Sequence, residues 1–157
     1  MEESIKTPQT GEPAGRDFRE LMARELKLRD MDLCTYSPLV LAYIGDAVYE
    51  LFIRTRVVNQ GSMQVSKMHK KSAELVKAQT QASLVRSLGE ELTPEELAVY
   101  KRGRNAKTVT MAKHATMADY RMATGFEALV GYLYLTGRYE RLLHLVHMGL
   151  EKMGELV

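Results

Sequence analysis

The sequence predicts an all-α protein, and three observations support that prediction. Apolar residues recur at spacings of three and four along most of the chain, which is the period of an amphipathic helix. Capping residues and prolines precede these segments, and glycines follow them. The alternation of apolar and polar residues that marks a half-buried strand does not occur. With 157 residues and one cysteine, the chain can form one ordinary domain without a disulfide framework.

The first 32 residues differ in composition from the rest of the chain. Residues 1–15 contain two prolines and two glycines but few large apolar side chains, which predicts a mobile tail. A short amphipathic helix is expected from Asp17 to Arg29. We therefore expect residues 1–32 to be a partly disordered extension and residues 33–157 to form the helical domain.

The first two helices of the domain have clear boundary signals. Ser37 can cap a helix whose first residue is Pro38, and the periodic pattern continues to about Val58. A second, long helix is predicted from about Val65 to Leu88, where Gly89 would close it.

Three further segments complete the domain. Thr93 and Glu96 form a capping-box pattern around Pro94, which predicts a short helix ending at Gly103. Residues 103–116 lack a clean period and are expected to form a basic loop. The last two helices are predicted over residues 117–136 and 139–153.

Positive charge is concentrated in two segments, although the net charge is only +2. Residues 63–86 carry five lysines and arginines against Glu74 alone, and residues 101–121 carry six against Asp119 alone. Such clustering is typical of a surface that binds a polyanion. The alternative is two solvated faces without a ligand.

Two acids, Asp46 and Glu127, lie within apolar helical segments, where an ionised carboxylate is costly to bury. Gly45 and Gly131 lie close to them, and a glycine inside a helix indicates that another backbone approaches closely. If these two helices pack together, both carboxylates could bind one divalent cation such as Mg²⁺. The alternative is a structural ion pair with an arginine such as Arg54 or Arg121.

Both acidic segments resemble a known family. Residues 43–50, Tyr-Ile-Gly-Asp-Ala-Val-Tyr-Glu, and residues 126–135, Phe-Glu-Ala-Leu-Val-Gly-Tyr-Leu-Tyr-Leu, resemble the two acidic signatures of the ribonuclease III catalytic domain. Residues 102–107, Arg-Gly-Arg-Asn-Ala-Lys, and the lack of a double-stranded-RNA-binding domain resemble the Mini-III branch of that family. The resemblance covers about residues 33–155.

This resemblance implies an all-helical homodimer that hydrolyses both strands of duplex RNA and leaves 5′-phosphate ends. Asp46 and Glu127 match the positions of the catalytic, metal-binding carboxylates. The implied cofactor is Mg²⁺, with Mn²⁺ as a substitute. Mini-III enzymes mature the large-subunit (23S) ribosomal RNA precursor, so this RNA is the expected substrate and a ribosomal protein an expected helper.

The chain departs from the broad ribonuclease III pattern at two positions. Ala42 and Thr124 stand where that pattern has further acids. The Mini-III pattern shares this reduced set, which favours the branch. Whether Glu50, Asp119 or Thr124 assists the metal stays open at this point.

An RNA substrate would explain both basic segments. Because the deep major groove of an RNA duplex hides the base edges, we expect recognition of backbone shape. Asn105 could contact a phosphate or a ribose hydroxyl, or could simply form a turn. The candidate RNA-binding residues are Lys67, His69, Lys70, Lys71, Arg102, Arg104, Asn105, Lys107 and Lys113.

Two other functions remain compatible with the sequence. The chain could be a non-catalytic helical RNA-binding or ribosome-associated protein, because two of the four family acids are missing. A helical nucleotide hydrolase is a weaker alternative, since the basic segments are too extended for a nucleotide. The acidic N-terminus and unpaired Cys34 favour a cytoplasmic protein, and no apolar run is long enough to cross a membrane.

Overall fold

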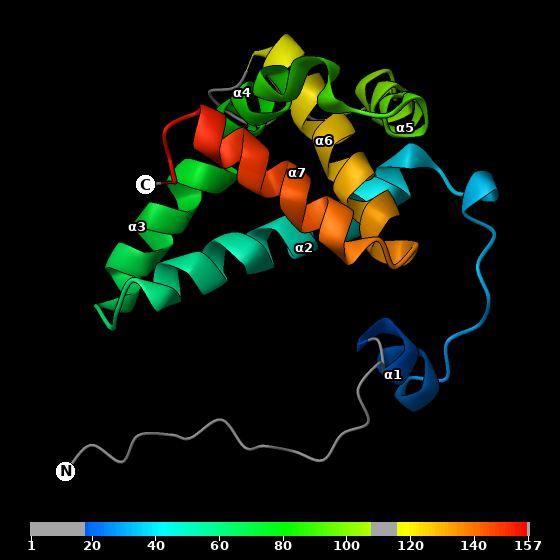
Figure 1. Cartoon of the computed structure of the whole chain (residues 1–157), viewed down its shortest axis with the longest axis horizontal. Coiled ribbons are helices and arrows are strands. Elements are labelled where there is room, and N and C mark those ends of the chain that lie inside the picture. The colour runs from blue at the N-terminus through cyan, green and yellow to red at the C-terminus, as the bar shows by residue number, and fades with distance from the viewer. Residues whose placement is uncertain (1–17, 108–115, 157) are drawn as a thin grey trace. The chain divides into compact units, whose positions relative to one another are not determined.

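The structure of the chain, a computed structural model, describes residues 18–107 and 116–156. These residues contain helices and no strands, which confirms the all-α prediction (Figure 1). The helices are α1 (Phe18–Glu25), α2 (Pro38–Asn59), α3 (Val65–Val76), α4 (Ala78–Leu88), α5 (Pro94–Arg104), α6 (Met117–Leu135) and α7 (Tyr139–Lys152), with 3₁₀ turns η1 (Leu33–Thr35) and η2 (Gly89–Glu91).

The chain divides into two compact units, residues 1–31 and 32–157. In the described part of the first unit, α1 ends four residues before the predicted end at Arg29. Lys27 has a positive φ of 52°, and Leu28 donates its N–H back to the carbonyl of Ala23. The left-handed residue ends the helix without a glycine, which explains why the sequence did not mark this boundary.

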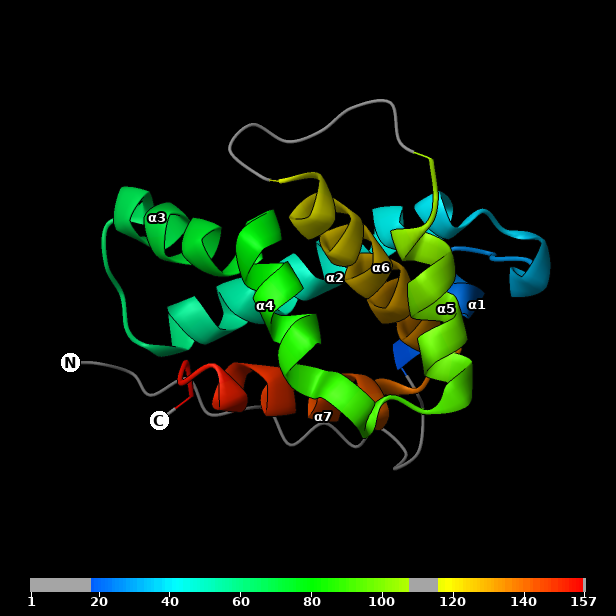
Figure 2. The same cartoon turned by 90° about the horizontal axis from the view of Figure 1, so that it is seen from above.

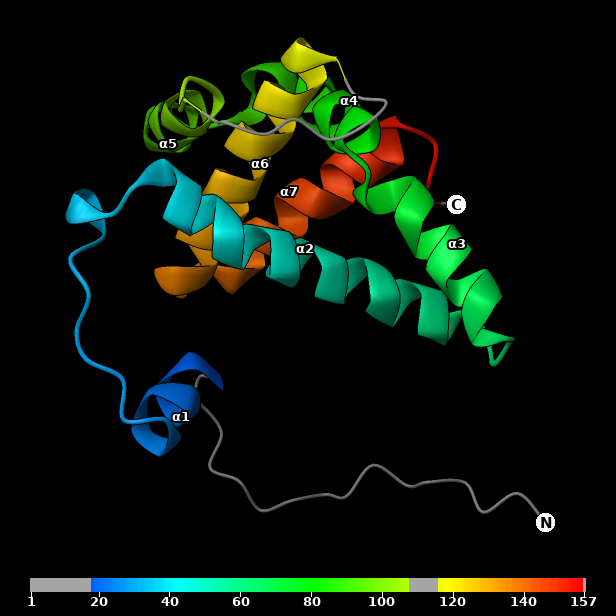
Figure 3. The ribbon, with the colours of Figure 1, turned by 180° about the vertical axis from the view of Figure 1, so that it is seen from behind.

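Within the second unit, α6 lies at the centre and packs against α2, α4, α5 and α7. Figure 2 shows α6 between α2 and α5. Figure 3, which views the chain from behind, shows α2 crossing in front of α6. The core includes Tyr49 of α2 and Phe126 of α6, whose rings meet edge to face with centroids 5.3 Å apart. The helices that carry Asp46 and Glu127 are therefore joined through the main core.

Capping residues set the helix starts as predicted. The Ser37 hydroxyl accepts a hydrogen bond from the N–H of Leu39, and Pro38 follows as the first residue of α2. Thr93 and Glu96 form both hydrogen bonds of the capping box at the start of α5. Such caps satisfy backbone groups that the first helical turn leaves without partners.

The prediction of a single long helix from Val65 to Leu88 is wrong. Lys77, with an extended ψ of 154°, separates α3 from α4. The break leaves three consecutive carbonyls without helical partners, and side chains replace those partners. Thr80 donates to the carbonyl of Glu74 at 2.6 Å, Tyr49 to that of Leu75 at 2.8 Å, and Gln81 to that of Val76 at 2.8 Å. Side-chain hydrogen bonds, one of them from the distant Tyr49 of α2, thus stabilise a break at which the chain has neither proline nor glycine.

Candidate active site

Asp46 and Glu127 come together where α2 crosses α6. Both line one pocket of 460 Å³, which also receives side chains from the break between α3 and α4. The backbone of α2 at Gly45 lies against the carbonyl group of Glu127, so the two helices approach as closely as the glycines predicted. This close approach positions the two carboxylates.

The two acids differ in exposure. Glu127 is half-buried, whereas Asp46 is exposed in the single chain, although both acids lie within apolar helical segments. Asp46 lines the pocket from a more exposed side of α2, whereas apolar residues of the same segment, among them Leu41, Val48 and Tyr49, are buried within the chain.

The environment of Glu127 strongly favours the protonated carboxyl. The pKa of Glu127 is raised to about 8, chiefly by burial. The negative charge of Asp46 and a hydrogen bond between the two side chains contribute the rest of this increase. A divalent cation would neutralise the repulsion between the carboxylates and replace the shared proton.

No arginine neutralises the pair within the described part of the chain. Arg54 binds Glu50 at 2.8 Å one turn along α2, and neither Asp46 nor Glu127 is within ion-pair distance of a described cation. The alternative of a structural ion pair with Arg54 or Arg121 therefore has no support in these residues. Lys77 is the only lysine or arginine among the described residues that line the pocket, and it is paired with Glu74 at 2.9 Å.

The candidate auxiliary acids lie elsewhere. Glu50 is engaged with Arg54, and Asp119 lies 3.5 Å from Arg86. In residues 18–107 and 116–156, no group of three or more acidic, histidine or cysteine side chains could enclose a metal ion. Thr124 does line the pocket and donates its hydroxyl proton to the carbonyl of Tyr120, which leaves its oxygen free to accept a hydrogen bond. The pocket thus offers two carboxylates and neutral oxygens, a set that suits a hydrated Mg²⁺ ion.

Two residues that sequence reasoning missed, Lys77 and Gln81, also line this pocket. Gln81 is 2% exposed, and its side-chain oxygen accepts no hydrogen bond in the described chain. Both residues reach the pocket because the chain breaks between α3 and α4. The sequence carries no local signal for that break, so it offered no means of finding them.

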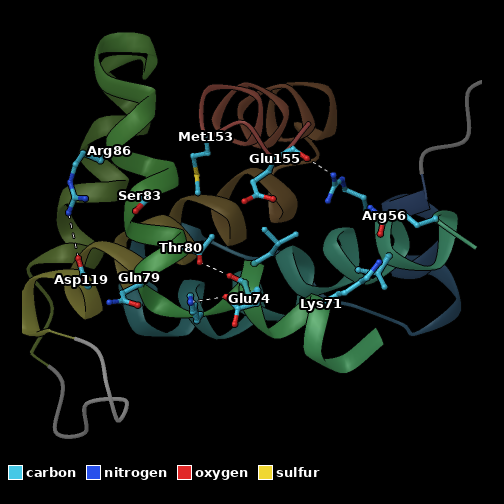
Figure 4. A pocket seen from close by; sticks show the side chains of 14 residues that line it. Arg56, Lys71, Glu74, Gln79, Thr80, Ser83, Arg86, Asp119, Met153 and Glu155 are labelled. Atoms are coloured by element: carbon cyan, nitrogen blue, oxygen red, sulfur yellow. Dashed lines mark hydrogen bonds and ion pairs between the residues drawn. The ribbon is translucent and has the colours of Figure 1, made fainter. Parts of the chain in front are cut away.

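A second pocket, of 690 Å³, adjoins the first through Lys77, which lines both. Figure 4 shows charged side chains of both signs around it. Arg56 donates to the backbone carbonyl of Glu155, and Arg86 pairs with Asp119. Lys71 is the only predicted RNA-binding residue among the described residues of this pocket.

The candidate RNA-binding residues fall into two groups. Those of residues 67–71 are exposed on α3, whereas those of residues 102–107 lie at and just beyond the end of α5. Arg104 lies over the ring of Tyr100 at 5.7 Å, and its guanidinium donates to the side-chain oxygen of Asn105. Asn105 itself caps α5, as the turn-forming alternative predicted. Lys113 lies outside the described residues.

Similarity to known proteins identifies the family to which this arrangement belongs. Residues 39–138 match the ribonuclease III domain. The chain belongs to the ribonuclease III family. It is 54% identical over 112 residues to the Mini-ribonuclease 3 of Clostridium tetani, covering 71% of this chain and 74% of that protein. The Mini-ribonuclease 3 of Enterococcus faecalis is 49% identical over 119 residues, which cover 74% of this chain and 90% of the relative.

A solved structure supports the fold of this ribonuclease III domain. A crystal structure of a Fusobacterium nucleatum protein superposes with a TM-score of 0.71 at 30% identity, covering 81% of this chain and all of that one. The chain is thus an endoribonuclease of the Mini-III branch, in a family of divalent-metal-dependent enzymes that act on RNA. In residues 18–107 and 116–156, we find no helix long and apolar enough to cross a bilayer.

Proposed function

We propose that the chain cleaves double-stranded RNA with Mg²⁺ at the Asp46–Glu127 site, and that it matures the large-subunit ribosomal RNA precursor as a homodimer. Residues 33–157 would form the catalytic domain, and cleavage would leave 5′-phosphate ends. The observation that carries this proposal is the pair of carboxylates that share one pocket without a neutralising arginine in the described chain.

The residues around the pocket fit a hydrated cation. Asp46 and Glu127 would each supply an anionic oxygen, and Glu127 would release its proton when the cation binds. Bound Mg²⁺ supplies an activated water and neutralises charge on the phosphodiester. Lys77 would contribute a positive charge at the pocket edge, since its exposed ion pair with Glu74 is weak enough to exchange for a phosphate.

Two basic surfaces would bind the phosphate backbones of the duplex. One is the exposed part of α3 that carries Lys67, His69, Lys70 and Lys71. The other is the end of α5, which carries Arg102 and Arg104 and is followed by Lys107. Backbone contacts of this kind give salt-dependent affinity and recognise the shape of the duplex.

The exposed face of α2 supports a homodimer. Leu39, Val40, Tyr43 and Leu51 lie along one side of this helix, and Tyr43 is 81% exposed. An apolar stripe of this kind on a helix favours burial against a partner. A twofold symmetric pair of chains would present two sites to the two strands of a duplex.

One cleavage assay tests the proposed function. The full chain is incubated with duplex RNA and Mg²⁺ beside Asp46→Asn, which preserves the shape of the side chain but removes its charge. We expect the unchanged chain to cut and the variant to lose about a hundredfold or more in rate, because a metal ligand is removed. Arg54→Gln, which removes a cation outside the pocket, serves as the control and should cut normally. Equal cutting by the unchanged chain and by Asp46→Asn, or RNA binding without cutting by either protein, would exclude the proposal.

A further inference from the structure

Gln81 presents a buried oxygen whose partner is missing from the described chain. Its side-chain Nε2 donates to the carbonyl of Val76 at 2.8 Å, which fixes the plane of the amide group. Its Oε1 is buried and accepts no hydrogen bond from residues 18–107 or 116–156. A buried acceptor without a donor costs about 1–3 kcal/mol, so such groups usually have a partner.

The position of Gln81 indicates what that partner is. The side chain lines the same pocket as Asp46 and Glu127. Neither Thr124 nor Lys77 donates to Oε1 in the described chain, since Thr124 donates to the carbonyl of Tyr120 and Lys77 contacts Glu74. An oxygen of an ionised phosphodiester cannot donate a hydrogen bond to Oε1, because both oxygens are acceptors.

We propose that Gln81 Oε1 accepts a hydrogen bond from a water molecule of the cation held by Asp46 and Glu127, so that Gln81 positions the cation's hydration shell. This inference rests on the proposed function. A Mg²⁺ ion bound by only two carboxylates keeps several waters, and each of these is a strong hydrogen-bond donor. The carbonyl bond from Nε2 holds the oxygen in place, and the break at Lys77 exists in part through that bond. Gln81 is thus a positioning residue that acts through the cation's water.

A metal-binding measurement without RNA tests this inference. Mn²⁺, which substitutes for Mg²⁺ in such sites, is titrated into the full chain, and free Mn²⁺ is followed by electron paramagnetic resonance. The titration compares the unchanged chain with Gln81→Leu, Asp46→Asn and Thr80→Val. We expect Gln81→Leu to raise the dissociation constant about tenfold or more, in the range typical of residues that support a metal site from outside.

Thr80→Val is the matched control. Thr80 donates to the carbonyl of Glu74 at the same break, and it lines the larger pocket instead of the one that holds Asp46. If loosening of the break were the cause, Thr80→Val would weaken Mn²⁺ binding as much as Gln81→Leu does, and that result would overturn the inference. If Gln81→Leu does not fold, Gln81→Met carries the same expectation, with folding checked by circular dichroism.

The remaining outcomes separate this inference from the proposed function. Mn²⁺ binding that requires Asp46 but is unchanged in Gln81→Leu would overturn the role of Gln81 and leave the metal site intact. If that variant also lost its preference for RNA over DNA, the partner of Oε1 would be a ribose 2′-hydroxyl. Absence of Asp46-dependent Mn²⁺ binding in the unchanged chain would overturn both proposals.

Discussion

Gly45 of α2 and Gly131 of α6 each face a backbone carbonyl of the opposite helix. A Cβ atom on Gly45 would lie 1.7 Å from the carbonyl oxygen of Glu127, and one on Gly131 would lie 2.0 Å from that of Leu41. Real Cβ atoms do not approach oxygen at these distances, so any side chain here must push the helices apart. The two glycines therefore set the separation of the helices that carry Asp46 and Glu127.

The first prediction is that Gly131→Ala destabilises the fold although alanine favours helix. Alanine gains about 1 kcal/mol of helix propensity over glycine, but the clash with a backbone carbonyl cannot be relieved by a side-chain rotation. We expect a net loss of at least about 2 kcal/mol in the free energy of unfolding, measured by urea denaturation.

Gly149→Ala is the matched control for this prediction. Gly149 also lies inside a helix, α7, but a Cβ atom there meets side-chain atoms of Leu84, the nearest at 2.5 Å, and not a backbone carbonyl. Because a side chain can shift more readily than a backbone carbonyl of a packed helix, the loss should be smaller than at Gly131. Equal losses at both positions would show that the carbonyl contact does not determine the approach of α2 and α6.

The second prediction concerns the pH dependence of stability without metal. The pKa of Glu127 rises from an ordinary value of 4.5 to about 8 in the folded chain. Between these pH values the folded chain keeps a proton that the unfolded chain has lost, so stability must fall as the pH rises. Below about 4.5 both states are protonated, and above about 8 both are ionised, so the change is confined to this window.

Glu127→Gln removes this titration and provides the measurement. The free energy of unfolding of the unchanged chain, taken relative to Glu127→Gln, should decline from pH 4.5 to pH 8. Glu140→Gln, which removes an exposed carboxylate of α7, controls for the loss of one negative charge. A constant difference across the window would mean that Glu127 is not protonated in the metal-free fold.

The sequence predicted most helix boundaries because local chemistry marks them. Pro38 and Pro94 follow capping residues, and the structure places the starts of α2 and α5 at these prolines. The break at Lys77 could not be predicted, because the groups that replace its helical hydrogen bonds include Tyr49, which lies far away in the sequence. Local patterns do not contain information about such tertiary partners.

The residues of the candidate site were likewise predictable only in part. Asp46 and Glu127 stand out as acids within apolar segments, and their shared pocket agrees with the facing helices that the nearby glycines predict. Gln81 enters the pocket only through the break at Lys77. The exposure of Asp46 could not be predicted either, because an apolar helix face looks the same in sequence whether it packs within one chain or against another.

The third prediction compares two arginines that bind neighbouring glutamates. Arg141 binds Glu96 through two contacts of 2.8 Å, and the Glu96 side chain is 3% exposed. Hydrogen bonds from this arginine lower the pKa of Glu96. Arg141→Met should therefore reduce the free energy of unfolding by about 2 kcal/mol or more, because it leaves a buried carboxylate without its partner.

Arg138→Met is the control for this ion pair. Arg138 binds Glu95 with similar geometry at 3.0 Å, but the Glu95 side chain is 52% exposed and remains solvated without its partner. Loss of the Arg138 side chain should therefore reduce the free energy of unfolding by less than loss of Arg141 does. Thermal unfolding of both variants decides the point, and a larger effect at Arg138 would contradict the argument from burial.

The fourth prediction tests the basic surface at the end of α5. Lys107 is exposed just beyond this helix, three residues after Arg104. If it contacts a phosphate, Lys107→Gln should weaken binding to duplex RNA and reduce the slope of log affinity against log salt by about one. Binding is measured with the Asp46→Asn form so that the RNA stays intact.

Lys152→Gln provides the comparison, since Lys152 lies on α7 and makes a 3.9 Å contact with Glu91. It removes the same charge from another surface and should leave the salt slope unchanged. An equal change in both variants would mean that overall charge, and not a contact at Lys107, determines the slope.

The fifth prediction addresses the exposed apolar face of α2. Val40 belongs to this face, is 48% exposed and does not line the pocket of Asp46 in the described chain. If two chains pair through this face, Val40→Asp would bury a charge without a partner in the interface and separate them. Sedimentation velocity should then show a dimer for the unchanged chain and a monomer for the variant.

Leu143→Asp is the control for this prediction. It changes a residue of α7 with a similar exposure of 50% and should remain dimeric, because α7 lies outside the proposed interface. A Val40→Asp dimer as stable as that of the unchanged chain would exclude pairing through this face of α2.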